Sequence, residues 1–126
     1  ANRKEVNEFL NAADLGVLLR HKHQLNILAS PGKCGEYACT GLQILTTKYI
    51  GDYPVDLEQQ NNGIFLENFT DIKKINTQIE EFKKSKKWND KNRRKRIAKY
   101  FSKKYSIQAN IEKYKKILNE LIKDKN

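Results

Sequence analysis

The spacing of apolar residues in the first half of the chain predicts one helix followed by three strands. Over residues 3–13, apolar side chains recur every three or four positions, which is typical of an amphipathic helix. Residues 15–19 form a short continuous apolar run, as expected for a strand covered on both faces. Two further apolar and β-branched runs cover residues 42–47 and 64–66. These runs predict a short parallel sheet.

Helix signals lie between the predicted strands. Ser30 followed by Pro31 is a strong helix start, because Ser caps an orphan amide and Pro suits the first helical position. Gly41 then stands where a left-handed C-terminal residue is needed. Residues 50–54 predict a turn and residues 55–60 a short helix. Repeated β-α-β units of this kind predict right-handed connections between the strands.

The second half of the chain predicts helices only. One begins near Asp71, a second at Asn89, and a third is capped by Ser106 and closes the fold with its apolar face. The predicted fold class is α/β, with a short parallel Rossmann-like sheet flanked by helices and with C-terminal helices. We expect one domain over residues 1–126, divided into a β/α part (1–70) and a helical part (71–126).

Positive charge is concentrated in the second half. The formal net charge is +10, and between Lys83 and Lys104 twelve of twenty-two residues are Lys or Arg against one acid, Asp90. Such a stretch attracts polyanions without specifying which. A basic nucleic-acid-binding module therefore stays open as an alternative function, and so does peripheral contact with an anionic membrane.

The cysteines and histidines point to neither a disulfide nor a metal site. Cys34 and Cys39 fall in one predicted helix as a poor disulfide pair, so we expect reduced packing residues. His21 and His23 lack a third ligand at metal-binding spacing, so no metal site is expected. With no leader sequence or membrane-spanning run in the sequence, the prediction is a cytoplasmic protein, with the inner membrane face as an option.

Candidate binding residues follow from the predicted topology. Open parallel sheets bind ligands at the carboxyl ends of their strands. Residues 20–30 and 48–53 are the loops at those ends, and Gly32 and Lys33 fall in the first turn of the helix that follows the first loop. Free amides and an ammonium group there suit a diphosphate. Asp52, in the second loop, is a weaker candidate for sugar binding, while Tyr37 and Trp88 are expected to be packing residues.

Three segments together resemble a known family. SPGKCGEYACTGLQILTT, IGDYP and NNGIFL resemble, in order and spacing, the donor-binding region of retaining glycosyltransferases of the GT-B fold, group 1 type. YFSKKYSIQANIEKYKKIL looks like the end of that family, so the resemblance extends from Val6 to Leu118. It implies that the Glu36 carboxylate accepts hydrogen bonds from ribose hydroxyls, and that the diphosphate and transferred sugar lie beside Ser30, Pro31, Gly32 and Lys33. Without the resemblance, Glu36 is an ordinary exposed helix residue.

The resemblance also implies a function and its limits. The function is transfer of a sugar from a nucleotide-diphosphate sugar to a glycan or lipid-linked acceptor in polysaccharide biosynthesis. The nucleotide-diphosphate sugar is a substrate, and no cofactor is expected. Relatives carry a Glu near the donor sugar where this chain has Leu28, so the catalytic residues stay unassigned. Acceptor-binding residues of the family belong to a separate N-terminal domain. The chain therefore looks like a truncated part of such an enzyme, inactive by itself.

Overall fold

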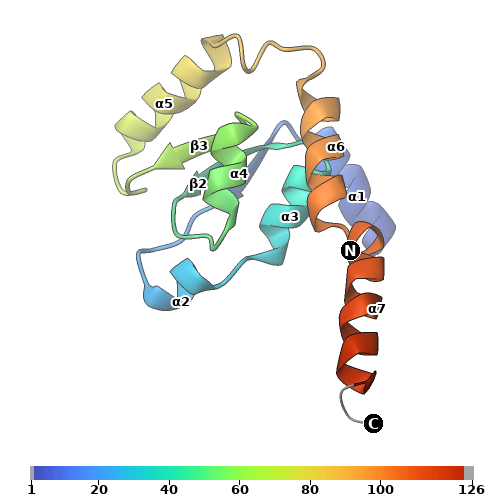
Figure 1. The fold of residues 1–126 in the computed structure, drawn as a ribbon. Coiled ribbons are helices and arrows are strands. Elements are labelled where there is room, and N and C mark those ends of the chain that lie inside the picture. Colours follow the sequence, from blue (N-terminus) through green and yellow to red (C-terminus); the bar gives the residue numbers. More distant parts are fainter. Residues whose placement is uncertain (1, 124–126) are drawn as a thin grey trace.

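The computed structural model describes residues 2–123 and has an α/β architecture, shown in Figure 1. A three-stranded parallel sheet runs in the order β1-β2-β3, with Leu15 opposite Gln43 and Ile44 opposite Gly63. Its strands are β1 (Leu15–Leu18), β2 (Gln43–Thr47) and β3 (Gly63–Leu66). This confirms the predicted fold class: a short parallel sheet flanked by helices, consistent with a small Rossmann-like fold, with helices at the C-terminal side.

The helices lie near the positions that the apolar spacing predicted, with several differences. They are α1 (Arg3–Ala12), α2 (Gln24–Leu28), α3 (Gly32–Cys39), α4 (Tyr53–Gln59), α5 (Ile72–Lys84), α6 (Arg93–Tyr105) and α7 (Ile107–Lys123). The single turn α2 was not predicted, and α4 begins two residues early because Pro54 suits a first helical turn. The predicted start at Asn89 is wrong, because its side chain donates hydrogen bonds to the Lys83 and Ser85 carbonyls at the end of α5.

Two apolar clusters form the core, one on each face of the sheet. The larger cluster lies beneath α3, α4 and α6 and consists of Cys34, Ala38, Ile44, Ile50, Tyr53, Leu57, Ile97 and Phe101. The smaller one joins Leu45, Ile64 and Leu66 to the apolar side of α5. Every residue of β2 is buried, since β2 is the central strand under both layers. Both cysteines are free, and burial raises the pKa of Cys34 to about 12.

The prediction that the first strand is covered on both faces is wrong. Among the described residues β1 is an edge strand paired with β2 alone, and the side chain of Val17 is 51% exposed. α5 packs on β3, at the opposite edge of the sheet. The face of β1 that carries Val17 is therefore left open.

The end of α3 is formed as predicted. Gly41 has φ of +77°, in the left-handed region where residues with a Cβ are strained. Its amide donates to the Ala38 carbonyl, and the Leu42 amide donates to the Tyr37 carbonyl. This is the Schellman pattern of hydrogen bonds, and it turns the chain from α3 directly into β2.

Arg94 ties three segments together. Its guanidinium group donates to the carbonyls of Leu10 (2.7 Å), Ala13 (2.9 Å) and Thr40 (3.0 Å). These carbonyls lie at the C-terminal ends of α1 and α3, where helical hydrogen bonding leaves acceptors free. One member of the basic stretch therefore fixes the packing of α6 against the N-terminal half.

The prediction that the last helix closes the fold is wrong. Ser106 does cap α7, since its hydroxyl accepts from the Ala109 amide, but Figure 1 shows α7 extending away from the sheet. Large apolar residues of α7 are between 43% and 73% exposed, namely Ile107, Ile111, Tyr114, Ile117, Leu118, Leu121 and Ile122. Within residues 2–123, α7 contributes no residue to either core cluster, and it contacts α6. Within residues 2–123 no helix combines the length and the apolarity needed to cross a bilayer.

Candidate functional site

The first turn of α3 is the centre of the predicted site, and it begins one residue later than expected. Pro31 is the buried N-terminal cap residue, has an extended backbone and makes no side-chain capping bond. The prediction that Ser30 caps this helix is therefore wrong. Gly32 and Lys33 lie in the first helical turn, as predicted, and both are exposed. Amides in these positions have no partner inside a helix, so they are free to bind an anion.

Ser30 has a different role, because it packs against the loop that follows β2. Gly51 has φ of +66°, and a Cβ placed on it would lie 2.6 Å from the Ser30 Oγ and 2.9 Å from the Ser30 Cα. The approach is possible because Gly51 has no side chain. The structure thus brings together the two loops that were predicted to flank the ligand.

Glu36 lies one turn further along α3, beside a hollow of about 390 Å³. Gly32, Gly35, Glu36 and Cys39 contribute one face of the helix to the hollow, and its other lining residues are Tyr53, Tyr105, Ser106, Ile107 and Gln108. Within residues 2–123 the Glu36 carboxylate has no hydrogen-bond or ion-pair partner. An exposed, unpaired carboxylate of this kind can accept from two hydroxyl groups of a ligand. Ser30, Pro31 and Lys33 are not among the lining residues.

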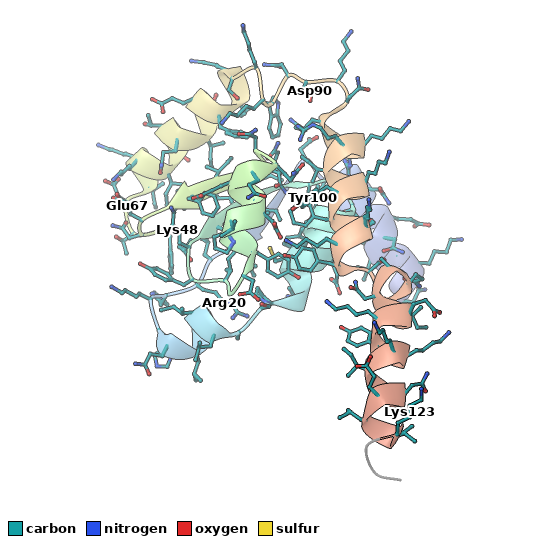
Figure 2. All side chains as sticks on the ribbon, viewed as in Figure 1. Arg20, Lys48, Glu67, Asp90, Tyr100 and Lys123 are labelled. Atoms are coloured by element: carbon teal, nitrogen blue, oxygen red, sulfur yellow. The ribbon has the colours of Figure 1, made fainter. Side chains whose placement is uncertain are left out.

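Two tyrosines form the inner side of this hollow, and a buried carboxylate fixes one of them. The rings of Tyr53 and Tyr105 lie 5.0 Å apart. The Tyr105 hydroxyl donates to Asp56, which is only 3% exposed. Asp56 also accepts from the Tyr100 hydroxyl (2.9 Å) and from the Lys104 ammonium (2.7 Å). The network joins α4 to α6, and Figure 2 shows Tyr100 between these helices.

The pKa values in this network follow from burial and hydrogen bonding. Burial opposes ionisation of Asp56, but the hydrogen bonds from Lys104, Tyr105 and Tyr100 outweigh it, so the pKa of Asp56 is lowered. Burial and the bond to Asp56 raise the pKa of Tyr105. Burial also raises the pKa of Tyr53 to about 12. Asp56 is therefore ionised at neutral pH and pairs with the Lys104 ammonium, while the tyrosines stay protonated.

The sequence did not point to this network. Helical spacing placed Tyr100 on the inner side of its helix, but nothing marked Asp56 as its partner, because the two are 44 positions apart. The only available signal was the pair Tyr100 and Lys104, four residues apart on one helix face.

A second, smaller hollow lies at the carboxyl ends of the strands. It has a volume of about 200 Å³ and is lined by Arg20, His21, Lys22, Thr47, Tyr49, Glu67, Asn68, Phe69 and Thr70. Arg20 and Glu67 lie on the same side of the molecule as Lys48 in Figure 2. The Thr47 hydroxyl donates to the Arg20 carbonyl (2.7 Å) and fixes the first loop onto β2. Cationic and acidic side chains thus meet at the edge where parallel sheets bind ligands.

The remaining predicted residues have simpler surroundings. The His21 ring contacts Phe69 at 4.6 Å, and His23 caps α2 by accepting from the Leu25 amide. Across the described part of the chain, no three His, Cys, Asp or Glu side chains gather in a way that could hold a metal ion. Leu28, where the resembled family has Glu, is 83% exposed. Asp52 is exposed and makes no capping bond to α4.

The two aromatic residues that were expected to be packing residues do pack. Tyr37 lies against the larger core cluster. Trp88 contacts Phe82 edge to face and lies beneath the Arg93 guanidinium at 4.2 Å.

Comparison with known proteins identifies no relative: no protein-family model, no curated protein and no solved structure matches this chain.

Proposed function

We propose that this chain is the donor-binding part of a glycosyltransferase that takes a nucleotide-diphosphate sugar as substrate. One observation carries the proposal. The start of α3 meets the loop after β2 at the carboxyl edge of a parallel sheet, through the contact of Ser30 with Gly51. Glu36 lies one turn away with an unpaired carboxylate beside a hollow. The family resemblance assigns diphosphate binding to the start of α3 and ribose binding to Glu36.

Each residue has a distinct role in the proposal. The amides of Gly32 and Lys33, with the Lys33 ammonium, bind the diphosphate at the positive end of α3. They stabilise the negative charge that grows on the diphosphate as the bond to the sugar breaks. Glu36 accepts hydrogen bonds from the ribose hydroxyls and takes no part in bond breaking. Retention of the anomeric configuration is implied by the resemblance alone.

The acceptor is a glycan or a lipid-linked glycan in this proposal, as in polysaccharide biosynthesis. The resemblance assigns the acceptor-binding residues to a separate N-terminal domain of the same enzyme. Binding of the donor nucleotide is therefore the appropriate test for residues 1–126, and turnover is not.

Calorimetric titration with uridine and guanosine diphosphates and their sugar conjugates tests the proposal. Glu36→Ala should weaken binding of the cognate nucleotide by about 10- to 100-fold, since hydrogen bonds to a charged group contribute about 1.5–3 kcal/mol. Glu81→Ala is the matched control, because it removes an exposed carboxylate from α5. Equal affinity of wild type and Glu36→Ala for every nucleotide would refute the assigned role.

A further inference from the structure

Most of the net charge of the chain belongs to two consecutive helices. α6 carries seven cations and no acid, and α7 carries four lysines against two glutamates. The two helices therefore hold +9 of the formal net charge of +10. The sequence predicted an attraction for polyanions from this stretch, but could not say how the charges are arranged.

On α6 the charges line a groove. Lys95, Lys99 and Lys103 are exposed and follow one another every fourth residue, so neighbours in the row are about 6 Å apart along the helix axis. They border a hollow of about 450 Å³ together with Arg96, Tyr100, Asn92 and Gln60. None of the three lysines has an acidic partner within residues 2–123. Their charges are therefore available to an anionic ligand.

α7 follows α6 directly in the chain and carries an apolar surface. Its seven exposed apolar residues recur every three or four positions; Lys113 and Lys116 lie between them in the sequence, and Lys123 follows the last. A soluble monomer seldom exposes so many large apolar side chains together. An apolar stripe with lysines on the remaining surface is typical of a helix that lies in the plane of a membrane surface.

We propose that α6 and α7 form one surface that binds an anionic lipid bilayer. The lysines of the α6 groove contact phosphates of the lipid headgroups, while the apolar stripe of α7 enters the boundary between headgroups and acyl chains. The proposal goes beyond donor binding and does not depend on it.

Two other partners fit the surface less well. A nucleic acid would neutralise the lysine row but would leave the apolar stripe of α7 exposed to water. A second copy of the chain could cover the stripe, but it would bring another +9 of like charge into the same interface. An anionic bilayer offers both negative charge and an apolar interior.

The position of α7 would also place the membrane close to the hollow beside Glu36. Ile107 lines that hollow and is the first residue of the apolar stripe. A bilayer that covers the stripe therefore lies next to the candidate donor site, where a lipid-linked acceptor would be within reach.

Co-sedimentation with lipid vesicles tests the proposal. The chain should bind vesicles of phosphatidylcholine mixed with phosphatidylglycerol, should not bind vesicles of phosphatidylcholine alone, and should be released by salt. The triple variant Lys95→Gln/Lys99→Gln/Lys103→Gln should lower the affinity on the order of 100-fold. Ile111→Gln/Leu118→Gln should lower it by at least about 10-fold, because two apolar side chains no longer leave water.

Matched control variants show whether a loss of vesicle binding is specific to α6 and α7 or follows from any loss of charge or apolar surface. Lys83→Gln/Lys86→Gln/Lys87→Gln removes the same charge elsewhere, and Ile72→Gln removes a side chain that is 70% exposed on α5. Both should change vesicle affinity by less than about 5-fold. Circular dichroism verifies that each variant is folded, and Glu36→Ala should bind vesicles like the wild type, which keeps this test separate from that of donor binding.

Several results would overturn the proposal. These are failure to bind the mixed vesicles, equal binding to neutral vesicles, or losses in the matched variants as large as those in the α6 and α7 variants. If the α6 variant binds vesicles like the wild type but no longer binds a single-stranded oligonucleotide, the partner is a nucleic acid. If the α7 variant only dissociates an oligomer in solution, the partner is a second copy.

Discussion

Gly51 and Ser30 are in direct contact, although they lie 21 positions apart in the sequence, because Gly51 has no side chain and a positive φ of 66°. The contact joins the loop after β2 to the residue that precedes the cap of α3. The geometry of the predicted diphosphate site therefore depends on a residue that would not touch the ligand.

Gly51→Ala should destabilise the fold and weaken nucleotide binding. The left-handed backbone costs Ala about 1–2 kcal/mol, and the contact with Ser30 adds a steric cost, so we expect a loss of about 2 kcal/mol or more in unfolding free energy. Chemical denaturation measures this loss. Gly32→Ala is the control, since a Cβ at Gly32 meets nothing within 4 Å, and it should be neutral or slightly stabilising. Equal losses in both variants would contradict the assigned contact.

Asp56→Asn should remove a stabilisation that depends on pH. Because the folded pKa of Asp56 is lowered, its contribution is complete above the unfolded value of about 4 and is lost as pH falls through the folded value. At pH 7 the variant should lose about 2 kcal/mol, and its stability should approach that of the wild type in acid. Urea denaturation from pH 7 down to about pH 2 measures the difference.

The exposed carboxylate Asp52 is the control for this prediction. Asp52→Asn should change the free energy of unfolding by less than about 0.5 kcal/mol at any pH in the series. A constant difference between Asp56→Asn and wild type across the series would show that the carboxylate charge is unimportant.

Arg94→Lys should destabilise the protein although the charge is kept. Lysine cannot reach the carbonyls of Leu10, Ala13 and Thr40 in the forked geometry of the guanidinium group. We expect a loss of about 2–3 kcal/mol, measured by thermal and chemical denaturation. Arg96→Lys, at an exposed position on the same helix, should cost less than about 1 kcal/mol. Similar small losses in both variants would show that Arg94 is only a surface cation.

The sequence predicted the elements well where the signal was local. Gly41 marked the end of α3 because only a left-handed residue completes that turn, and the apolar run of β2 marked a buried strand. Ser106 capped α7 as its chemistry suggested. These predictions needed only neighbouring residues.

Features that depend on distant partners could not be predicted. The apolar stripe of α7 shows which side of a helix avoids water, but not whether another element is there to cover it. Arg94 belongs to a basic run in the sequence, yet its acceptors lie 54 to 84 positions away. Pro31 takes the N-cap position of α3 without a capping bond, and Ser30 packs on Gly51, a contact between separate loops.

The candidate site was predicted in part. The resemblance implied ligand-binding roles for Gly32 and Glu36, and both line the same hollow. Tyr53 and Tyr105 come from α4 and α6, and pairing between helices so far apart in sequence leaves no local pattern. Nucleotide binding stays a prediction. A single experiment can test where on the chain a nucleotide binds.

The most direct test of the donor-site proposal is a nuclear magnetic resonance titration of the ¹⁵N-labelled chain with uridine or guanosine diphosphate. The account predicts saturable shifts of the amides of Gly32, Lys33 and Glu36 and of the loop around Gly51. Shifts confined to Lys95, Lys99 and Lys103, or no saturable shift with either nucleotide, would contradict a nucleotide site at the start of α3.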